Sequence, residues 1–314
     1  MKSNRVLSFS ALKIAAHPVV RCFAAAALLA GAAVATEGGG SVYPEGAETV
    51  LPAVYPAPGG SLFAEFNDFY VANEMAGPNG RAVLAGFHLR VSAAAGKVVH
   101  NWGLHVLGGT LVSMGALPLL DIHLTAPFGQ QNKLGIGNAD IENVILYKTG
   151  NVHWWYGYEI YPPGFGYTKN ALVNVGQHNW ASGPSAAFSW LPNGGRAELS
   201  SKLQYIVNYK DDATDYRSGN EFVWEYAGLV NLSKRVAVGA NGYYYQQTTG
   251  DIEDGLMYLD GNRGRNVAFG PEIRCHVGHY VMALKWQKDL FTENRPMGNA
   301  VWFQFGVPFG HAHE

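Results

Sequence analysis

The chain has 314 residues, of which 15% are charged, 13% are aromatic and 39 are Gly. In soluble domains about a quarter of the residues are usually charged. The lower fraction here argues against a soluble enzyme and suits a sheet whose outer surface faces lipid. Four of the 22 Lys and Arg lie in residues 1–35, which leaves 18 against 24 Asp and Glu and a net charge of about −6. Nucleic acid is therefore not an expected partner, because a phosphate binder needs a basic face.

Residues 1–35 have the pattern of a signal peptide. Four basic residues are followed by an uncharged apolar run over 22–31 and by Ala33-Val34-Ala35, which matches the small-x-small cleavage pattern. The apolar run is too short to span a bilayer, although an uncleaved N-terminal anchor is the alternative. Cleavage would remove Cys22 and leave Cys275 as the sole cysteine, so no internal disulfide is expected.

The mature chain divides into three parts by pattern. Residues 36–60 are rich in Gly, Pro and Ala without a period, and we interpret them as an irregular N-terminal arm or a partial plug. Residues 61–309 alternate between apolar and polar positions, most clearly over 301–309, where large apolar residues occupy every second position. Residues 310–314 form a short tail. This two-faced pattern is typical of a closed sheet with an apolar outside and a polar inside.

Twelve strands are expected in the barrel part, with a long irregular connection over 162–183. Alternating short and long connections are typical of an up-and-down membrane barrel, and closure of a single bacterial chain requires an even strand number. The fold predicted is therefore an all-β, antiparallel, up-and-down transmembrane β-barrel of 12 strands, with 10 or 14 as alternatives. The strand segments are 62–70, 83–91, two within 98–125, 140–147, 154–161, 198–209, 221–230, 236–245, 265–276, 280–289 and 301–309.

Polar and charged residues recur on the face opposite the apolar one. Arg or Lys on the lipid face at mid-bilayer costs about 2–4 kcal/mol, so these residues are expected inside the barrel or at its rims. They serve either a polar conduit or a lattice of paired charges that keeps the wall rigid. The candidates for lining the lumen are Glu65, Arg90, Trp155, Glu159, Glu198, Lys202, Glu221, Glu225, Tyr243, Tyr245, Glu272, Arg274, Lys285, Gln287, Trp302 and Gln304.

The sequence carries no recognisable catalytic or cofactor motif. No Gly-x-Ser-x-Gly occurs, and Gly135-x-Gly137 is too short to cradle a phosphate. His311 and His313 in the tail have no further ligands at suitable spacing. No catalytic, cofactor-binding or metal-binding residue is therefore expected, and the protein is expected not to be an enzyme; a hydrolase in the barrel wall is the least favoured alternative.

Several sequence blocks, in their order and spacing, resemble an outer-membrane family of phenol meta-pathway degradation proteins that are described as transporters. The resemblance covers roughly residues 60–309, and it departs from the family at Asn138, where Asp is expected, and at Pro162-Pro163-Gly164, where Pro-Thr-Gly is usual. The blocks are Gly135 to Asp140, Asn179-Trp180 followed by Pro184, Tyr216 to Glu221, Gly242 to Gln247, Gly264-Arg265 leading to Gly270-Pro271, and Glu293 to Gly298. The resemblance implies an outer-membrane barrel linked to the uptake of hydrophobic, often aromatic, compounds, with no catalytic residues to carry over.

Taken together, these features predict a passive channel in the bacterial outer membrane for small hydrophobic or aromatic compounds. The expected partners are outer-membrane lipids, these solutes, and the outer-membrane assembly machinery, which would engage the C-terminal strand ending at Phe309. No cofactor is expected. A structural or adhesive barrel that acts through its loops is the alternative function, and a soluble secreted β-sandwich is the alternative fold.

Overall fold

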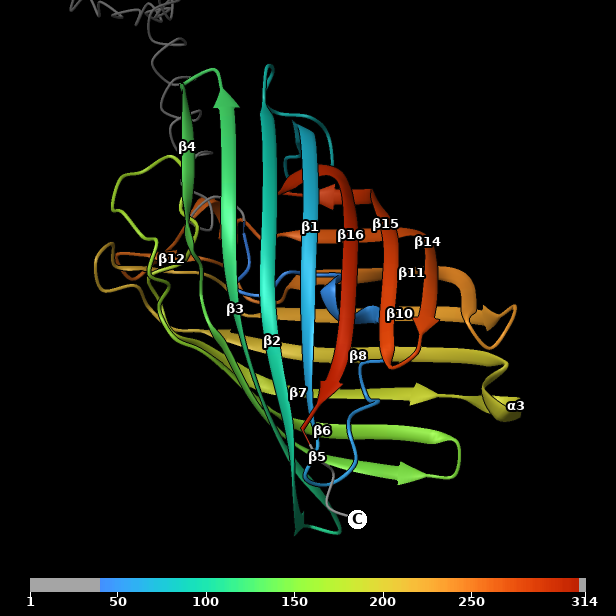
Figure 1. The fold of residues 1–314 in the computed structure, drawn as a ribbon. Coiled ribbons are helices and arrows are strands. Elements are labelled where there is room, and N and C mark those ends of the chain that lie inside the picture. Colours follow the sequence, from blue (N-terminus) through green and yellow to red (C-terminus); the bar gives the residue numbers. More distant parts are fainter. Residues whose placement is uncertain (1–39, 311–314) are drawn as a thin grey trace, which may run out of the picture. The chain divides into compact units, whose positions relative to one another are not determined.

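The computed structural model describes residues 40–310, which form a closed antiparallel barrel of twelve strands (Figure 1). The predicted signal peptide and the tail residues 311–314 lie outside the described residues. Each strand pairs with the next along the chain, and β1 pairs with β16 to close the wall. The strands are β1 (Ser61–Met75), β2 (His88–Val106), β3 (Gly109–Ala126), β5 (Asp140–Thr149), β6 (Val152–Tyr161), β7 (Ala181–Trp190), β8 (Ala197–Asn208), β10 (Glu221–Asn231), β11 (Val236–Gln247), β14 (Arg265–Val277), β15 (Tyr280–Glu293) and β16 (Pro296–Phe309).

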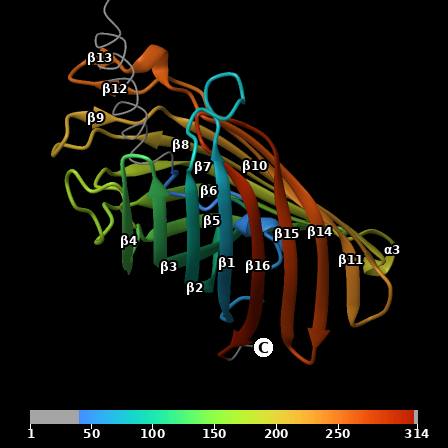
Figure 2. The same ribbon diagram turned by 90° about the horizontal axis from the view of Figure 1, so that it is seen from above.

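The connections distinguish the two ends of the barrel. Short turns join β2 to β3, β5 to β6 and β14 to β15 at one end, and α3 (Pro192–Gly195) lies in the β7–β8 turn there. Most connections at the other end are long, although residues 294–295 alone join β15 to β16. At this end β9 (Tyr216–Arg217), β12 (Ile252–Glu253) and β13 (Leu256–Met257) form a small separate sheet (Figure 2), followed by the short helix η2 (Leu259–Gly261). Short turns face the periplasm in bacterial outer-membrane barrels and long loops face outward.

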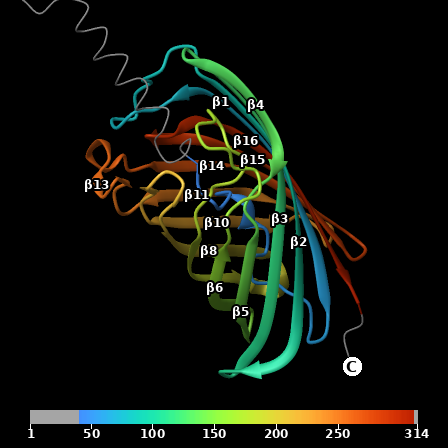
Figure 3. The same cartoon turned by 90° about the vertical axis from the view of Figure 1, so that its left-hand side faces the viewer.

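One additional strand extends the wall beside β3. The two longest strands, β2 and β3 with 19 and 18 residues, curve along one side of the barrel (Figure 3). β3 pairs with β5 from Thr110 to Ala116, but from Leu119 to Ala126 it pairs with β4 (Gly129–Ile136). The change of partner coincides with Pro118, because a proline has no N–H to donate to a ladder. β4 and β5 are thus two halves of one strand, interrupted at residues 137–139.

The predicted alternation is present in the wall. On β16, Val301 and Phe303 are each 41% exposed, whereas the intervening Trp302 is 3% exposed and faces the interior. Exposed Leu, Phe, Trp and Tyr side chains recur around the outside, which is the arrangement that lipid requires and water disfavours. Within residues 40–310, no helix is long and apolar enough to cross a membrane.

The strand boundaries differ from the sequence prediction in two places. β7 was not predicted: it begins within the segment 162–183 that was expected to be irregular, and it extends beyond that segment. The sequence did not reveal it because Ala, Ser and Gly around Pro184 lack the large side chains that mark a strand.

Three strands were expected over 83–125, but the structure has two, β2 and β3. The first begins only at His88 and continues to Val106, and the apolar residues before His88 belong to the loop between β1 and β2. The predicted number of twelve is correct because this extra strand offsets the missed β7. Leu84 and Phe87 in the loop between β1 and β2 are buried against Leu124. Their apolar side chains made the loop look like a strand in the sequence, but they pack against β3 instead of forming part of the wall.

Candidate transport site inside the barrel

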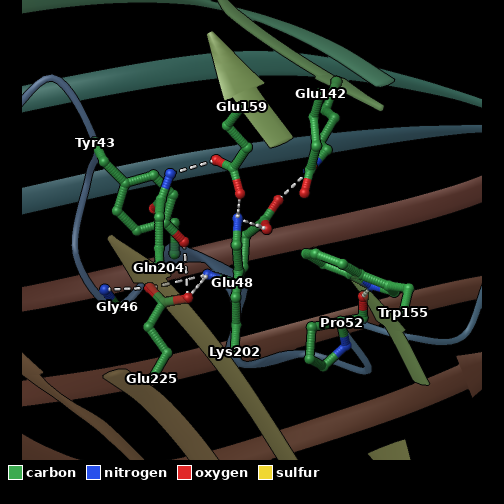
Figure 4. A network of polar contacts seen from close by, with 12 residues as sticks. Tyr43, Gly46, Glu48, Pro52, Glu142, Trp155, Glu159, Lys202, Gln204 and Glu225 are labelled. Atoms are coloured by element: carbon green, nitrogen blue, oxygen red, sulfur yellow. Dashed lines mark hydrogen bonds and ion pairs between the residues drawn. The ribbon is translucent and has the colours of Figure 1, made fainter. Parts of the chain in front are cut away.

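The segment before β1 lies inside the barrel and contacts the inner wall over most of its length. It contains one short helix, η1 (Ala47–Thr49), with irregular chain on both sides. The Tyr43 hydroxyl donates to Glu225 Oε2 at 2.7 Å, and the Gly46 N–H donates to Glu225 Oε1 at 2.5 Å (Figure 4). Further along, the Trp155 indole N–H donates to the Pro52 carbonyl at 2.7 Å. We call the described part of this segment, residues 40–60, the arm.

A charge cluster fixes the middle of the arm. The Glu48 carboxylate is held by two wall lysines, Lys202 at 2.6 Å from Oε2 and Lys97 at Oε1. Each lysine also contacts a wall carboxylate, Lys202 with Glu159 at 3.0 Å and Lys97 with Glu142 at 3.2 Å. All four wall residues are buried. Breaking a buried pair by removing one partner costs about 3–5 kcal/mol, so this cluster holds the arm firmly.

A second group of wall side chains, on β15 and β16, binds the backbone of the arm. Lys285 donates to the carbonyls of Gly46 at 2.7 Å and Ala47 at 3.0 Å, and to the Thr49 hydroxyl at 2.9 Å. Gln304 donates to the Ala47 carbonyl at 2.6 Å, and Gln287 donates to the Gly46 carbonyl at 3.1 Å. These bonds satisfy carbonyl groups that an irregular buried segment would otherwise leave unpaired.

The remaining interior charges pair mainly within the wall. Arg274 binds Glu198 at 2.5 Å and Glu272 at 2.8 Å, while Arg295 binds Glu45 of the arm at 2.8 Å. Acids nevertheless outnumber bases inside the described barrel. The acids are Glu45, Glu48, Asp68, Asp140, Glu142, Glu159, Glu198, Glu221, Glu225, Glu272 and Asp289, and the bases are Lys97, Lys202, Arg274, Lys285 and Arg295. The interior therefore holds an excess of acidic side chains.

Two cavities lie in the lumen on either side of the Glu48 cluster. The larger, of about 340 Å³, has one apolar wall formed by Leu89, Val91, Ala93 and Ala95 of β2 and by Pro118, Leu120 and Ile122 of β3. The smaller, of about 160 Å³, is lined by Leu51 and Val54 of the arm and by Leu62, Val99 and Ala283 of the wall. Glu48, Phe66 and Lys97 border both cavities. The arm and its charge cluster thus lie between a larger cavity with one apolar wall and a smaller, mostly apolar cavity.

Most residues expected in the lumen are buried in the interior. Glu159, Lys202, Glu225, Lys285, Gln287, Gln304 and Trp155 take part in the contacts with the arm or its charge cluster, and Glu198, Glu272 and Arg274 form the wall pairs described above. Glu221 accepts from Asn208 at 2.8 Å, Tyr243 donates to Asp289 at 3.0 Å, the Arg295 guanidinium lies over the Tyr245 ring, and Trp302 donates to Gln287 at 2.9 Å.

Two expected residues are placed differently. Arg90 is exposed, and its neighbours Leu89 and Val91 line the larger cavity, so Arg90 lies on the outer face near the loop end of β2. A charge is tolerated there because it lies at the rim of the hydrocarbon layer. Glu65 is half-buried and only borders the smaller cavity, from the β1 face opposite to Ala64 and Phe66. β1 carries Asp68 on its inner face and Glu65 on the other face. The alternation of polar and apolar residues therefore did not show which face of β1 lines the lumen.

Three important residues escaped the sequence reasoning. Glu48 lies in a segment without periodicity, so nothing predicted its contacts. Glu142 lies on the inner face of β5 directly opposite Glu159, and extending the alternation to that strand would have identified it. Lys97 lies in the Ala-rich part of β2, where the expected strand boundaries were misplaced. These three residues complete the cluster that holds the arm.

Comparison with solved structures places the fold among outer-membrane barrels. The COG4313 outer membrane channel from Pseudomonas putida F1 superposes with a TM-score of 0.71 at 15% identity, covering 82% of this chain and 97% of that one. The β domain of the Bordetella autotransporter BrkA gives 0.47 at 13% identity, covering 81% and 100%. The translocator domain of the autotransporter NalP from Neisseria meningitidis gives 0.44 at 10%, covering 82% and 91%. No curated protein matches this sequence.

The closed wall, its apolar exterior and its paired polar interior place the protein in the bacterial outer membrane. A family model matches residues 72–305, which is nearly the whole barrel and well over half of the chain. The earlier resemblance rested on short blocks within this same region. The chain belongs to the protein family described as "Putative MetA-pathway of phenol degradation".

Proposed function

We propose that the protein is a passive outer-membrane channel that admits small hydrophobic, including aromatic, compounds. The observation that carries this proposal is the larger lumen cavity, whose β2 and β3 wall presents only apolar side chains from Leu89 to Ala95 and from Pro118 to Ile122. Its volume of about 340 Å³ lies in the range of small-molecule sites, which are mostly apolar with a few polar groups. A cavity of this kind favours an apolar solute over a hydrated one.

The proposed route runs from the larger cavity to the smaller one and then to the short-turn end of the barrel. Glu48, Phe66 and Lys97 border both compartments, so a solute that moves between them passes this point. On this proposal, the arm in its bound position obstructs the passage. We infer that passage requires a displacement of residues around Glu48, while the contacts at Pro52 and Tyr43 retain the arm in the lumen.

A matched pair of substitutions on β2 tests the role of the cavity. Ala95 lines the larger cavity, whereas the adjacent Ala94 lies on the other face of the same strand. Ala95→Trp fills the cavity, so liposomes containing this variant should take up toluene or phenol much more slowly than liposomes containing the native protein. Ala94→Trp places the same ring toward lipid and should leave uptake unchanged.

The proposal fails if the native protein accelerates the entry of neither compound relative to protein-free liposomes. It also fails if Ala94→Trp and Ala95→Trp reduce uptake equally, because the effect would then not depend on the cavity. Circular dichroism and heat-modifiable migration on gels establish that both variants form the barrel before uptake is compared.

A further inference from the structure

Three carboxylates of adjacent strands converge beside the larger cavity. Asp140 and Glu142 lie on β5, Glu159 lies on β6, and one oxygen of each lies within 4.8 Å of the other two. Glu142 and Glu159 occupy directly opposite positions in the β5–β6 register. Like charges in such positions are destabilising, and Figure 4 shows both carboxylates directed toward the same region near Glu48 and Lys202. The arrangement therefore needs a compensating positive charge.

The hydrogen bonding of this group is incomplete within the described structure. Glu142 is 0% exposed, and its Oε1 has no hydrogen-bond partner among the described residues, while its Oε2 contacts Lys97. Asp140 Oδ1 is likewise buried without a hydrogen-bond partner there. Buried acceptors are normally paired, and an unpaired one is costly. Buried carboxylate oxygens without partners, in a group of three carboxylates that lie within 4.8 Å of one another, point to a bound cation.

The local charges give the valence of that cation. When all four are ionised, Glu48, Asp140, Glu142 and Glu159 supply four negative charges, and the two lysines between them, Lys97 and Lys202, supply two positive ones. Both lysines are already shared between two carboxylates each, and Asp140 forms no ion pair with any residue of the range 40–310. Uncompensated charge is expensive to bury. The balance left over is two negative charges, which equals the charge of one divalent ion.

We propose that Asp140, Glu142 and Glu159 bind one divalent cation, and that this cation is Ca²⁺. All three ligands are oxygen donors, which suit Ca²⁺ or Mg²⁺ rather than metals that prefer nitrogen or sulfur. Ca²⁺ bonds to oxygen at about 2.3–2.6 Å in flexible geometry, so its ligands reach about 5 Å apart, whereas Mg²⁺ demands shorter bonds and near-ideal octahedra. The 4.8 Å span of this group fits the larger ion.

The position of the site explains both access and effect. Asp140 lines the larger cavity, so an ion reaches the carboxylates from the lumen. Asp140 is also the first residue of β5, immediately after the break at residues 137–139. A bound ion therefore ties β5 to β6 at the point where β3 changes its partner, and it relieves the repulsion across that strand pair.

Terbium luminescence tests the site, because Tb³⁺ occupies calcium sites and is excited through nearby aromatic rings. The Tyr161 hydroxyl hydrogen-bonds Glu159, which places a sensitising ring beside the site. Protein in detergent, freed of lipopolysaccharide, should give a saturable Tb³⁺ signal that Ca²⁺ displaces with a Kd of about 10⁻⁴–10⁻³ M, the range of extracellular calcium modules. Glu142→Gln should weaken Ca²⁺ binding by at least about tenfold, because affinity follows the charge of the ligands.

Glu221→Gln is the matched control. It removes another buried lumen carboxylate, but one that accepts from Asn208 and lies outside the cluster, so it should bind Ca²⁺ as the native protein does. The melting temperature of the native protein should also rise on adding Ca²⁺ and fall on adding EDTA, a measurement that needs no variant to fold. Absence of a Ca²⁺-displaceable signal, equal binding by Glu142→Gln, or a melting temperature that ignores Ca²⁺ would overturn the proposal.

Discussion

Substituting Glu48 by Gln isolates the contribution of the charge cluster to the closed lumen. The amide has nearly the same size as the carboxylate but cannot form the ion pairs with Lys202 and Lys97. The other arm contacts, such as those of Lys285 with the Gly46 and Ala47 carbonyls, are unaffected. The variant therefore loosens the middle of the arm without removing it.

The size of the effect follows from the partners that remain. Losing one member of a buried pair costs about 3–5 kcal/mol, and the lower value applies because Lys202 keeps Glu159 at 3.0 Å and Lys97 keeps Glu142 at 3.2 Å. Since each 1.4 kcal/mol corresponds to a factor of ten, about 3 kcal/mol raises the population of a displaced arm by about 100-fold.

Planar-bilayer recording measures this change directly. Glu48→Gln should show more frequent or larger openings than the native protein, together with faster solute uptake into liposomes. Glu198→Gln is the control, because it breaks a buried pair with Arg274 that does not involve the arm. If both variants change conductance equally, or if Glu48→Gln conducts as the native protein does, the Glu48 cluster does not control the passage.

Four further outcomes follow from the described contacts. Phe303→Arg places a charge on the lipid face and should cost about 2–4 kcal/mol at mid-bilayer, measured by equilibrium unfolding in lipid, with Phe309→Arg at the strand end costing less. Trp155→Phe removes the hydrogen bond to Pro52 and should cost about 1 kcal/mol in the same assay. Asp251→Ala removes the acceptor for the Gly219 N–H and the Asn262 amide, so hydrogen exchange in the β9–β12 region should quicken, while exchange in β16 stays slow. The acidic excess inside the barrel should make any ionic current selective for K⁺ over Cl⁻, and an anion-selective reversal potential would contradict this charge balance.

The sequence predicted most of the wall but not the contents of the barrel. In β8, β10 and β16, apolar and polar residues alternate with a period of two, because one face of each strand meets lipid. This alternation can be recognised in the sequence without knowing which strands are neighbours. In β7 the small residues that fit between neighbouring strands hide this period, and in β1 acidic residues on both faces blur it. The arm has no period, because its structure is set by wall groups up to 257 positions away in the chain, such as Gln304.

The many bonds between the arm and the wall have a consequence for biogenesis. The arm precedes every strand in the chain, yet it is bound by side chains of β2, β6, β8, β10, β15 and β16. Closing the wall first would trap buried lysines and carboxylates without their counterparts, and threading the arm in afterward would mean moving charged groups through a filled bore. Docking of the arm and closure of the wall are therefore coupled, because each supplies the polar partners that the other buries.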